Sequence, residues 1–176
     1  MNNRPWMIIL GSFFLVLALT IPILFHSLGL GSSFLPMFYP LVLSGFLLPL
    51  PIAMAVGVLG PLLSSLLTGM PPFYPPIAPV MMVEGLILSS GPFLLYQRWH
   101  QKSRLSLVIT LVLDRALLLG LAWLLSGWLK LPRAFISISS VVRGLPGILV
   151  MVIVIPPLIK QLEQQIKMHL STTSDW

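Results

Sequence analysis

The sequence has no cysteine and few charged residues, and both absences exclude classes of function. Without cysteine, the 176-residue chain has no disulfides, iron–sulfur clusters, thiolate zinc sites or cysteine nucleophile. Charged residues make up 8% of the chain, whereas soluble domains carry about 25%. Because 57% of the residues are hydrophobic, there is too little polar surface to cover a globule in water. The composition therefore indicates a membrane protein of single-domain size.

Motifs for common enzyme chemistry are also missing. The sequence has no Gly-x-x-x-x-Gly-Lys-Ser/Thr phosphate loop, so we do not expect this chain to use ATP itself. It has no Gly-x-Ser-x-Gly motif, and Ser64 and Ser65 stand in an apolar run with no assigned base. It lacks the His-x-x-x-His, Glu-x-x-His and paired-carboxylate spacings of metal sites. We expect no enzyme activity, no cofactor and no metal site.

Apolar runs divided by charge clusters and Pro/Gly punctuation predict an all-α protein with six transmembrane helices in one domain, residues 1–176. A helix needs about 20 mostly apolar residues to cross a hydrocarbon core of about 30 Å. The second and third runs are short and separated only by Leu50-Pro51, which predicts a tight hairpin or partly re-entrant helices. The predicted spans are 6–28, 36–50, 52–68, 79–99, 105–129 and 137–159, and a polar amphipathic tail follows at 160–176.

The positions of Lys and Arg predict that both termini are cytoplasmic, since short loops rich in these residues stay on that side of the membrane. With the N-terminus inside, only Lys130 and Arg133 lie outside, and Arg115 and Arg143 fall within spans. Such scattered charges predict no nucleic-acid surface. We expect a multi-pass protein of the cell membrane, of the prokaryotic plasma-membrane type. The predicted cytoplasmic cations are Arg4, Arg98, Lys102, Arg104, Lys160 and Lys167.

Two uncharged segments, 26–40 and 68–79, lie on the predicted outer side. The second has five prolines in twelve residues, so its backbone is stiff and displays its side chains at little entropic cost. This suits a lid whose aromatic rings stack on a planar ligand. The same composition is typical of the membrane interface of any polytopic protein, and both interpretations stay open. The candidate ligand contacts here are His26, Phe38, Tyr39, Phe73 and Tyr74.

His26 has further interpretations of its own. At the outer end of the first span, it is a candidate contact for a ligand or a metal. A lone histidine at an interface is also commonly hydrogen-bonded to its own neighbourhood. The sequence does not decide between these roles.

Charged residues within spans are candidate site residues, because each costs about 2.5 to 3.5 kcal/mol at mid-membrane and usually faces an interior or a cavity. Glu84 and Arg143 lie at similar predicted depths below the outer end of their spans, where we expect them to pair with each other or with a ligand. Asp114 and Arg115 are adjacent, so their side chains point about 100° apart and each needs another partner. Asp114 is a third candidate for the site.

Small residues in the first span predict a surface for close helix packing. Gly11 and Ala18 are seven residues apart and so lie near one face of a helix. This face is a candidate docking surface for a membrane partner. Packing within the chain explains it equally well.

Six short motifs lie along the predicted spans and outer segments: His26-x-x-Gly-x-Gly31, Phe34–Pro40, Ser44–Phe46, Gly60-Pro61, Leu67–Pro72 and Met82–Gly85. With the length and the six predicted spans, they resemble the substrate-binding S component of an energy-coupling-factor (ECF) transporter, in a branch with unassigned substrate. The resemblance covers nearly the whole chain. An Ala-x-x-x-Ala pair, which many members carry in the first span, is missing here, and Gly11 and Ala18 are the candidates to replace it.

The resemblance implies a subunit that captures a small nutrient, such as a vitamin or related heterocycle, at the outer face under the loops joining spans one to two and three to four. It also implies partners: a transmembrane coupling subunit and two cytoplasmic ATPases, which supply the energy for uptake. Two other functions stay open. One is a stand-alone secondary transporter, which needs an ion-coupling acid such as Asp114 or Glu84. The other is a membrane scaffold that binds no cargo.

Overall fold

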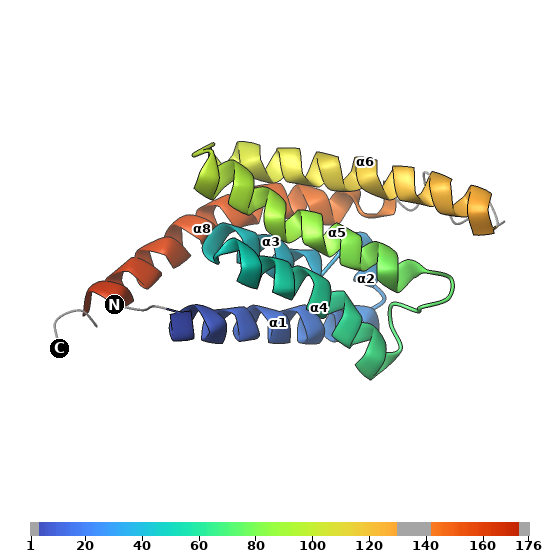
Figure 1. The fold of residues 1–176 in the computed structure, drawn as a ribbon, viewed down its shortest axis with the longest axis horizontal. Coiled ribbons are helices and arrows are strands. Elements are labelled where there is room, and N and C mark those ends of the chain that lie inside the picture. Colours follow the sequence, from blue (N-terminus) through green and yellow to red (C-terminus); the bar gives the residue numbers. More distant parts are fainter. Residues whose placement is uncertain (1–3, 130–141, 173–176) are drawn as a thin grey trace.

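The computed structural model describes residues 4–129 and 142–172, which form helices joined by short turns and contain no strand. Five helices are long and apolar enough to cross a membrane, and one apolar helix is shorter. The predicted all-α, polytopic fold of about six helices is therefore confirmed (Figure 1). In chain order the elements are α1 (Arg4–Ser27), α2 (Gly31–Phe34), α3 (Phe38–Leu47), α4 (Leu50–Thr68), α5 (Ile77–Pro92), the π-helical η1 (Phe93–Arg98), α6 (Ser103–Leu129) and α8 (Leu145–Thr172).

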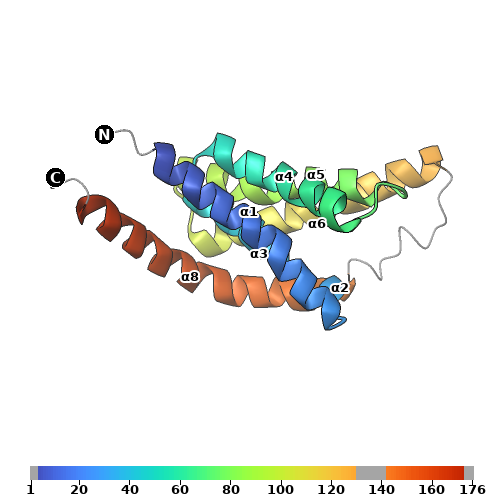
Figure 2. The same cartoon turned by 90° about the horizontal axis from the view of Figure 1, so that it is seen from below.

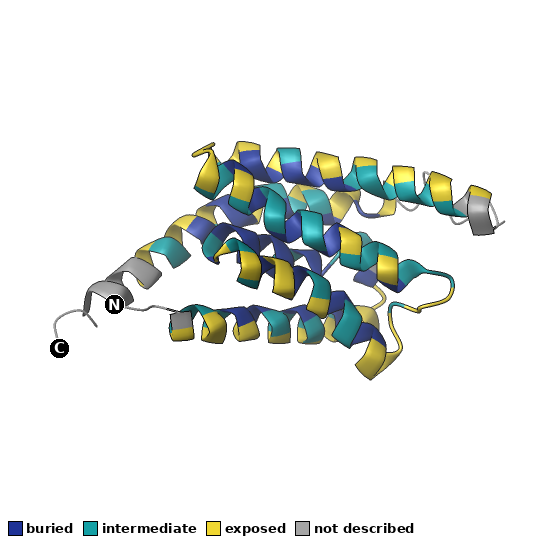
Figure 3. Cartoon of the chain, in the orientation of Figure 1, coloured by how far each residue is buried: buried dark blue, intermediate teal, exposed yellow. Residues whose placement is uncertain are grey.

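Helix α3 lies in the interior of the bundle, in contact with α1, α4, α5 and α8 (Figure 3). It has 10 residues, a length of about 15 Å, which is half the hydrocarbon core. Nearly every residue from Phe38 to Phe46 is buried. The second predicted span is thus a short central helix, which accounts for its low residue count and its hydrophobicity on all sides.

The C-terminal end of α3 is held by a side chain from η1. The Gln97 amide nitrogen lies 3.1, 2.8 and 3.2 Å from the backbone oxygens of Gly45, Phe46 and Leu48. The last carbonyls of a helix have no partner within the helix, and inside the bundle no water replaces one. Gln97 therefore supplies donors that the short helix lacks.

Helix α4 begins at Leu50, so the break between the second and third predicted spans lies at Leu48–Pro49 and not at Leu50-Pro51. Pro51 stands in the first turn of α4, where a missing N–H removes no helical hydrogen bond. A proline there starts a helix and does not separate two helices. This corrects the predicted boundary by two residues.

Helices α4 and α5 pack closely where two glycines face each other. A Cβ atom built on Gly57 would overlap the carbonyl oxygen of Gly85, and one built on Gly85 would overlap that of Gly57. Only glycine leaves room for backbones at this separation. The contact fixes α5, and with it Glu84, against the centre of the bundle.

The two ends of the bundle differ in charge. The start of α1, the turn from η1 to α6 and the C-terminal end of α8 lie at one end, and α2 and the 69–76 segment lie at the other (Figures 1 and 2). The exposed Arg98, Lys102 and Arg104 belong to the first end. This arrangement agrees with the loop assignment used for the predicted orientation; the cytoplasmic location of that end remains a prediction.

The last helix differs from its predicted span. Helix α8 begins at Leu145, so Arg143 precedes it, and it continues through the predicted tail to Thr172 with a bend visible in Figures 1 and 2. Pro156 and Pro157 lie inside the helix and interrupt its hydrogen bonds, which accounts for the bend. Residues 137–141 of the predicted span lie outside the described residues, as do Lys130 and Arg133.

Candidate functional site

A cavity of about 660 Å³ lies at the end of the bundle opposite the basic turn. Its walls come from the C-terminal ends of α1 and α4, from α2 and the start of α3, and from the start of α5, and residues 70–72 line it as well. Both predicted outer segments thus contribute to one site. The lining residues are Pro22, Ile23, His26, Gly31, Leu35, Pro36, Met37, Phe38, Ser64, Thr68, Met70, Pro71, Pro72, Ile77 and Met81.

Hydroxyl groups near the end of α4 hold the 70–72 segment in place. Ser64 Oγ donates to the Met70 oxygen at 2.7 Å, and Ser65 Oγ donates to the Pro71 oxygen at 2.6 Å. Thr68 Oγ1 accepts a hydrogen bond from the Met70 N–H at 3.2 Å. Prolines supply no N–H for a regular backbone ladder, so the carbonyls of this segment take side-chain donors instead.

These hydroxyl anchors were missed in the sequence, where Ser64 and Ser65 were considered only as nucleophiles. The signal that would have found them is a pair of hydroxyl residues one to two turns before Gly-Met-Pro-Pro. Carbonyls in a proline-rich turn need donors, and nearby serine or threonine side chains commonly supply them.

His26 lies at the cavity and packs against Gly31. A Cβ atom built on Gly31 would lie 2.6 Å from both Cε1 and Nδ1 of the His26 ring, so the ring occupies space that only glycine leaves open. Both residues line the cavity. The spacing of His26 and Gly31 noted in the sequence thus places an exposed imidazole directly over a glycine, where a larger residue would compete with it for space.

The predicted aromatic contacts separate into three groups. Phe38 lines the cavity. Tyr39 points toward α8, where its hydroxyl donates to the Gly147 oxygen at 3.3 Å. Phe73 and Tyr74 do not line the cavity and are 48% and 79% exposed. The stiff proline segment does display these two rings, but the part of it that lines the cavity is Met70, Pro71 and Pro72.

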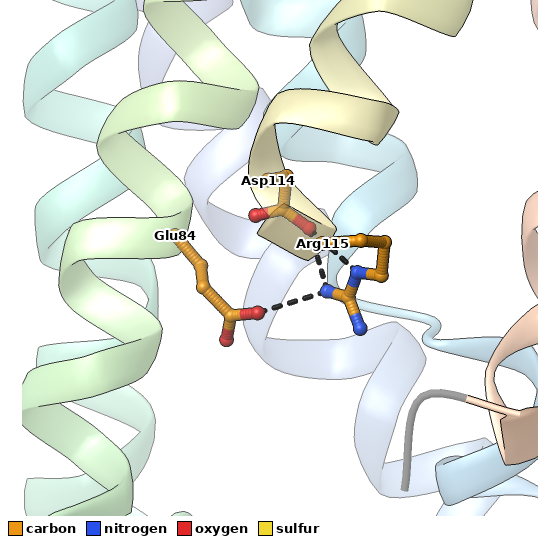
Figure 4. Close-up of polar contacts among 3 residues, drawn as sticks. All are labelled: Glu84, Asp114 and Arg115. Carbon is orange, nitrogen blue, oxygen red and sulfur yellow. Dashed lines mark hydrogen bonds and ion pairs between the residues drawn. The ribbon is translucent and has the colours of Figure 1, made fainter. Parts of the chain in front are cut away.

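The intramembrane charges form a separate cluster between α5 and α6 (Figure 4). The Arg115 Nη2 atom lies 2.8 Å from Glu84 Oε1 and 2.6 Å from Asp114 Oδ2. Arg115 Nε donates to the same Asp114 oxygen at 2.9 Å. Glu84 and Asp114 are buried, and an unpaired carboxylate is costly in the membrane interior. The Arg115 guanidinium contacts both of them and supplies the missing counter-charge.

This cluster corrects two predictions. Glu84 pairs with Arg115, whereas Arg143 is exposed and stands before α8, outside the helix that was expected to bring it to the depth of Glu84. Adjacent Asp114 and Arg115 do contact each other, because the long arginine side chain folds back across the 100° between their directions. Arg115 was absent from the predicted site residues, although its place in mid-span marked it as a residue that needs partners.

The cluster and the cavity meet at Phe38. The Arg115 guanidinium carbon lies 5.1 Å from the centre of the Phe38 ring, a cation–π contact. Glu84, Asp114 and Arg143 do not line the cavity. Asp114 Oδ1 has no hydrogen-bond partner among the described residues, and the cluster has two carboxylates for one guanidinium. The charged residues therefore support a wall of the cavity without entering it.

Gly11 and Ala18 face the interior of the chain. A Cβ atom built on Gly11 would lie 2.6 Å from Ile52 Cγ2 of α4, and one built on Gly60 of α4 would lie 3.5 Å from the Ala18 Cβ. Both residues are buried. The structure thus favours the intramolecular alternative for these small residues, because α4 already occupies the face proposed for a partner.

Within residues 4–129 and 142–172, no three His, Asp or Glu side chains gather as a metal site would require. No family model matches the sequence, and neither the curated proteins nor the solved structures contain a significant match.

Proposed function

We propose that the chain is the substrate-binding subunit of an ECF-type importer, which captures a small nutrient at the outer face of the cell membrane. The observation that carries the proposal is that both predicted outer segments line one cavity. It lies at the end opposite the basic turn of Arg98, Lys102 and Arg104, as an outward-facing site requires under the positive-inside rule.

The motifs behind the family resemblance support the same function. Residues of the 26–38 and 67–72 motifs are more than 25 positions apart in the sequence, yet both line the cavity. Local packing alone explains some of these motif residues; Gly31, for example, lies beneath the His26 ring. Motifs that converge on a void of about 660 Å³ fit a binding site, since ligand pockets are typically about 300 to 1,000 Å³.

The proposed subunit depends on partners for energy, because its sequence has no phosphate-binding loop. The partners in this proposal are a transmembrane coupling subunit and two cytoplasmic ATPases. The residues they contact on this chain are not Gly11 and Ala18, which face α4.

A blocked cavity tests the proposal. Met81→Trp places a large ring into the cavity lining, and Val112→Trp, on a side chain 61% exposed outside that lining, is the matched control. Each chain is purified in lipid nanodiscs, and bound small molecules are extracted and identified by mass spectrometry. We expect one nutrient-like compound in the wild type and in Val112→Trp but not in Met81→Trp.

Uptake provides the second arm of this test. The compound, radiolabelled, should enter cells only when the coupling subunit and active ATPases are present with the chain. Equal recovery of the compound from Met81→Trp and the wild type, or no bound compound in either, would contradict the proposal.

One observation favours a second candidate function, an ion-coupled secondary transporter. The charged cluster holds one carboxylate more than it has cations, and Asp114 Oδ1 has no partner among the described residues. Buried acids of this kind are a feature of ion and proton pathways in membranes. Uptake that persists without ATPases and is lost in Asp114→Asn would establish this function instead.

A further inference from the structure

We propose that the cargo is an uncharged, mainly apolar molecule whose principal polar contact is the imidazole of His26. This inference rests on the proposed function and narrows it to a class of substrate. It departs from the expectation, drawn from the sequence, that Glu84, Arg143 and Asp114 bind the cargo.

The described part of the cavity wall carries no charge. Among the fifteen lining residues that belong to the described ranges, none is Asp, Glu, Lys or Arg. A charged group that enters such a cavity gives up its hydration and finds no counter-charge, which costs several kcal/mol. The nearest charged cluster, Arg115 with Glu84 and Asp114, stands outside the lining and meets the wall only where Arg115 contacts the Phe38 ring. The wall therefore selects against charged molecules.

The hydroxyl groups of the wall donate their hydrogens within the chain. Three lining side chains carry polar atoms: His26, Ser64 and Thr68. The Ser64 hydroxyl donates to the Met70 oxygen, and the Thr68 hydroxyl donates to the Ser64 oxygen at 2.7 Å. Both hydrogens are used to hold α4 and the 70–72 segment. His26 is the lining side chain whose donor and acceptor nitrogens are left for a ligand.

His26 lines the cavity with its ring directly over Gly31, and a side chain at 31 would need the space that the ring fills. The histidine is exposed, so its nitrogens are accessible. A single polar side chain at an apolar cavity orients a ligand more than it adds affinity. The rest of the contact area includes Met37, Met70 and Met81, whose flexible, polarisable side chains adapt to rings or chains alike.

A matched set of probes tests the inference. Biphenyl-4-carboxamide, biphenyl-4-carboxylate and biphenyl-4-ylmethylammonium share a scaffold and differ in charge. Their affinities for the full chain in lipid nanodiscs are measured by thermal unfolding at several concentrations. We expect the neutral amide to bind at least about tenfold more tightly than either ion, a factor that corresponds to about 1.4 kcal/mol. Binding should be lost in Met81→Trp.

Variants of the histidine test its role. We expect His26→Ala to weaken amide binding about fivefold, the effect of one hydrogen bond, and Gly31→Ala to have the same effect by displacing the ring. His26→Gln, which keeps a donor and an acceptor, should recover part of the loss. Tyr74→Ala, which changes an aromatic side chain outside the cavity, should bind as the wild type does.

The outcomes separate this inference from the proposed function. A charged probe that binds as tightly as the amide, or no amide binding to the wild type, overturns the assigned substrate class. Unchanged amide affinity in both His26→Ala and His26→Gln overturns the role of the histidine. If Met81→Trp still abolishes ATPase-dependent uptake in these cases, the proposed function stands. If the probes behave as expected but uptake needs no ATPases, the cavity chemistry stands and the importer assignment fails.

Discussion

The cavity end of α4 and the charged cluster between α5 and α6 place polar residues in apolar surroundings in two different ways. At the cavity, Ser64 and Ser65 donate to the backbone of the neighbouring segment, and the result is an apolar wall. In the cluster, Arg115 binds two buried carboxylates. In both regions the polar groups first satisfy one another, so a polar residue within a span does not by itself mark the ligand site.

The two regions also differ in energetic scale. A neutral hydrogen bond contributes about 0.5 to 1.5 kcal/mol net. Removal of one partner of a buried ion pair costs about 3 to 5 kcal/mol, because a charge is left uncompensated. We therefore expect substitutions in the cluster to act on folding and substitutions at the cavity to act mainly on binding.

The largest effect is expected from Arg115→Met. This change leaves Glu84 and Asp114 without their cation, and we expect a loss of about 3 to 5 kcal/mol in stability, measured as the free energy of unfolding in detergent. Arg143→Met, at an exposed arginine, is the control and should unfold as the wild type does. The triple variant Arg115→Met, Glu84→Gln, Asp114→Asn should recover most of the stability. A single variant as stable as the control would show that the cluster has no structural role.

An intermediate effect is expected from the double variant Ser64→Ala, Ser65→Ala. It removes the donors to the Met70 and Pro71 oxygens, and we expect a loss of about 1 to 3 kcal/mol for the two hydrogen bonds. Because these residues hold the 70–72 segment, binding of biphenyl-4-carboxamide should weaken as well. Ser12→Ala, at an exposed serine of α1, is the control. A loss of stability with unchanged probe binding would show that these two hydrogen bonds do not shape the cavity.

The smallest effect is expected from Phe73→Ala and Tyr74→Ala. Both side chains are exposed and outside the cavity lining. Changes at such positions usually lie within about 0.5 kcal/mol of the wild type. We expect unchanged unfolding and unchanged probe affinity by thermal shift. A loss of binding in either variant would restore the lid role predicted from the sequence.

The apolar runs and their punctuation predicted the membrane fold well, because about 20 apolar residues per crossing is a requirement of the bilayer. The family resemblance implied one site under both predicted outer segments, and residues of both segments line the cavity, His26 and Phe38 among them. Side-chain direction was harder to predict. Glu84 was paired with Arg143 on depth alone, and depth carries no information about which helices are adjacent. Phe73 and Tyr74 were chosen for their chemistry, whereas the fold of the prolines decides which way they point.

The capped end of α3 has a consequence for how the chain is assembled in the membrane. Gln97 follows the carbonyls that it binds by 49 to 52 residues. The carbonyls at the end of α3 therefore gain the Gln97 donor only after η1 has been synthesised, so this half-length helix is capped after α5 is complete. The chain has no native thiol, so a cysteine introduced by Ser44→Cys can report this order. A water-soluble maleimide should label that cysteine in a chain that ends at residue 92. It should not label it in the full-length protein, where Ser44 is buried. Equal protection in both would show that α3 takes its place unaided.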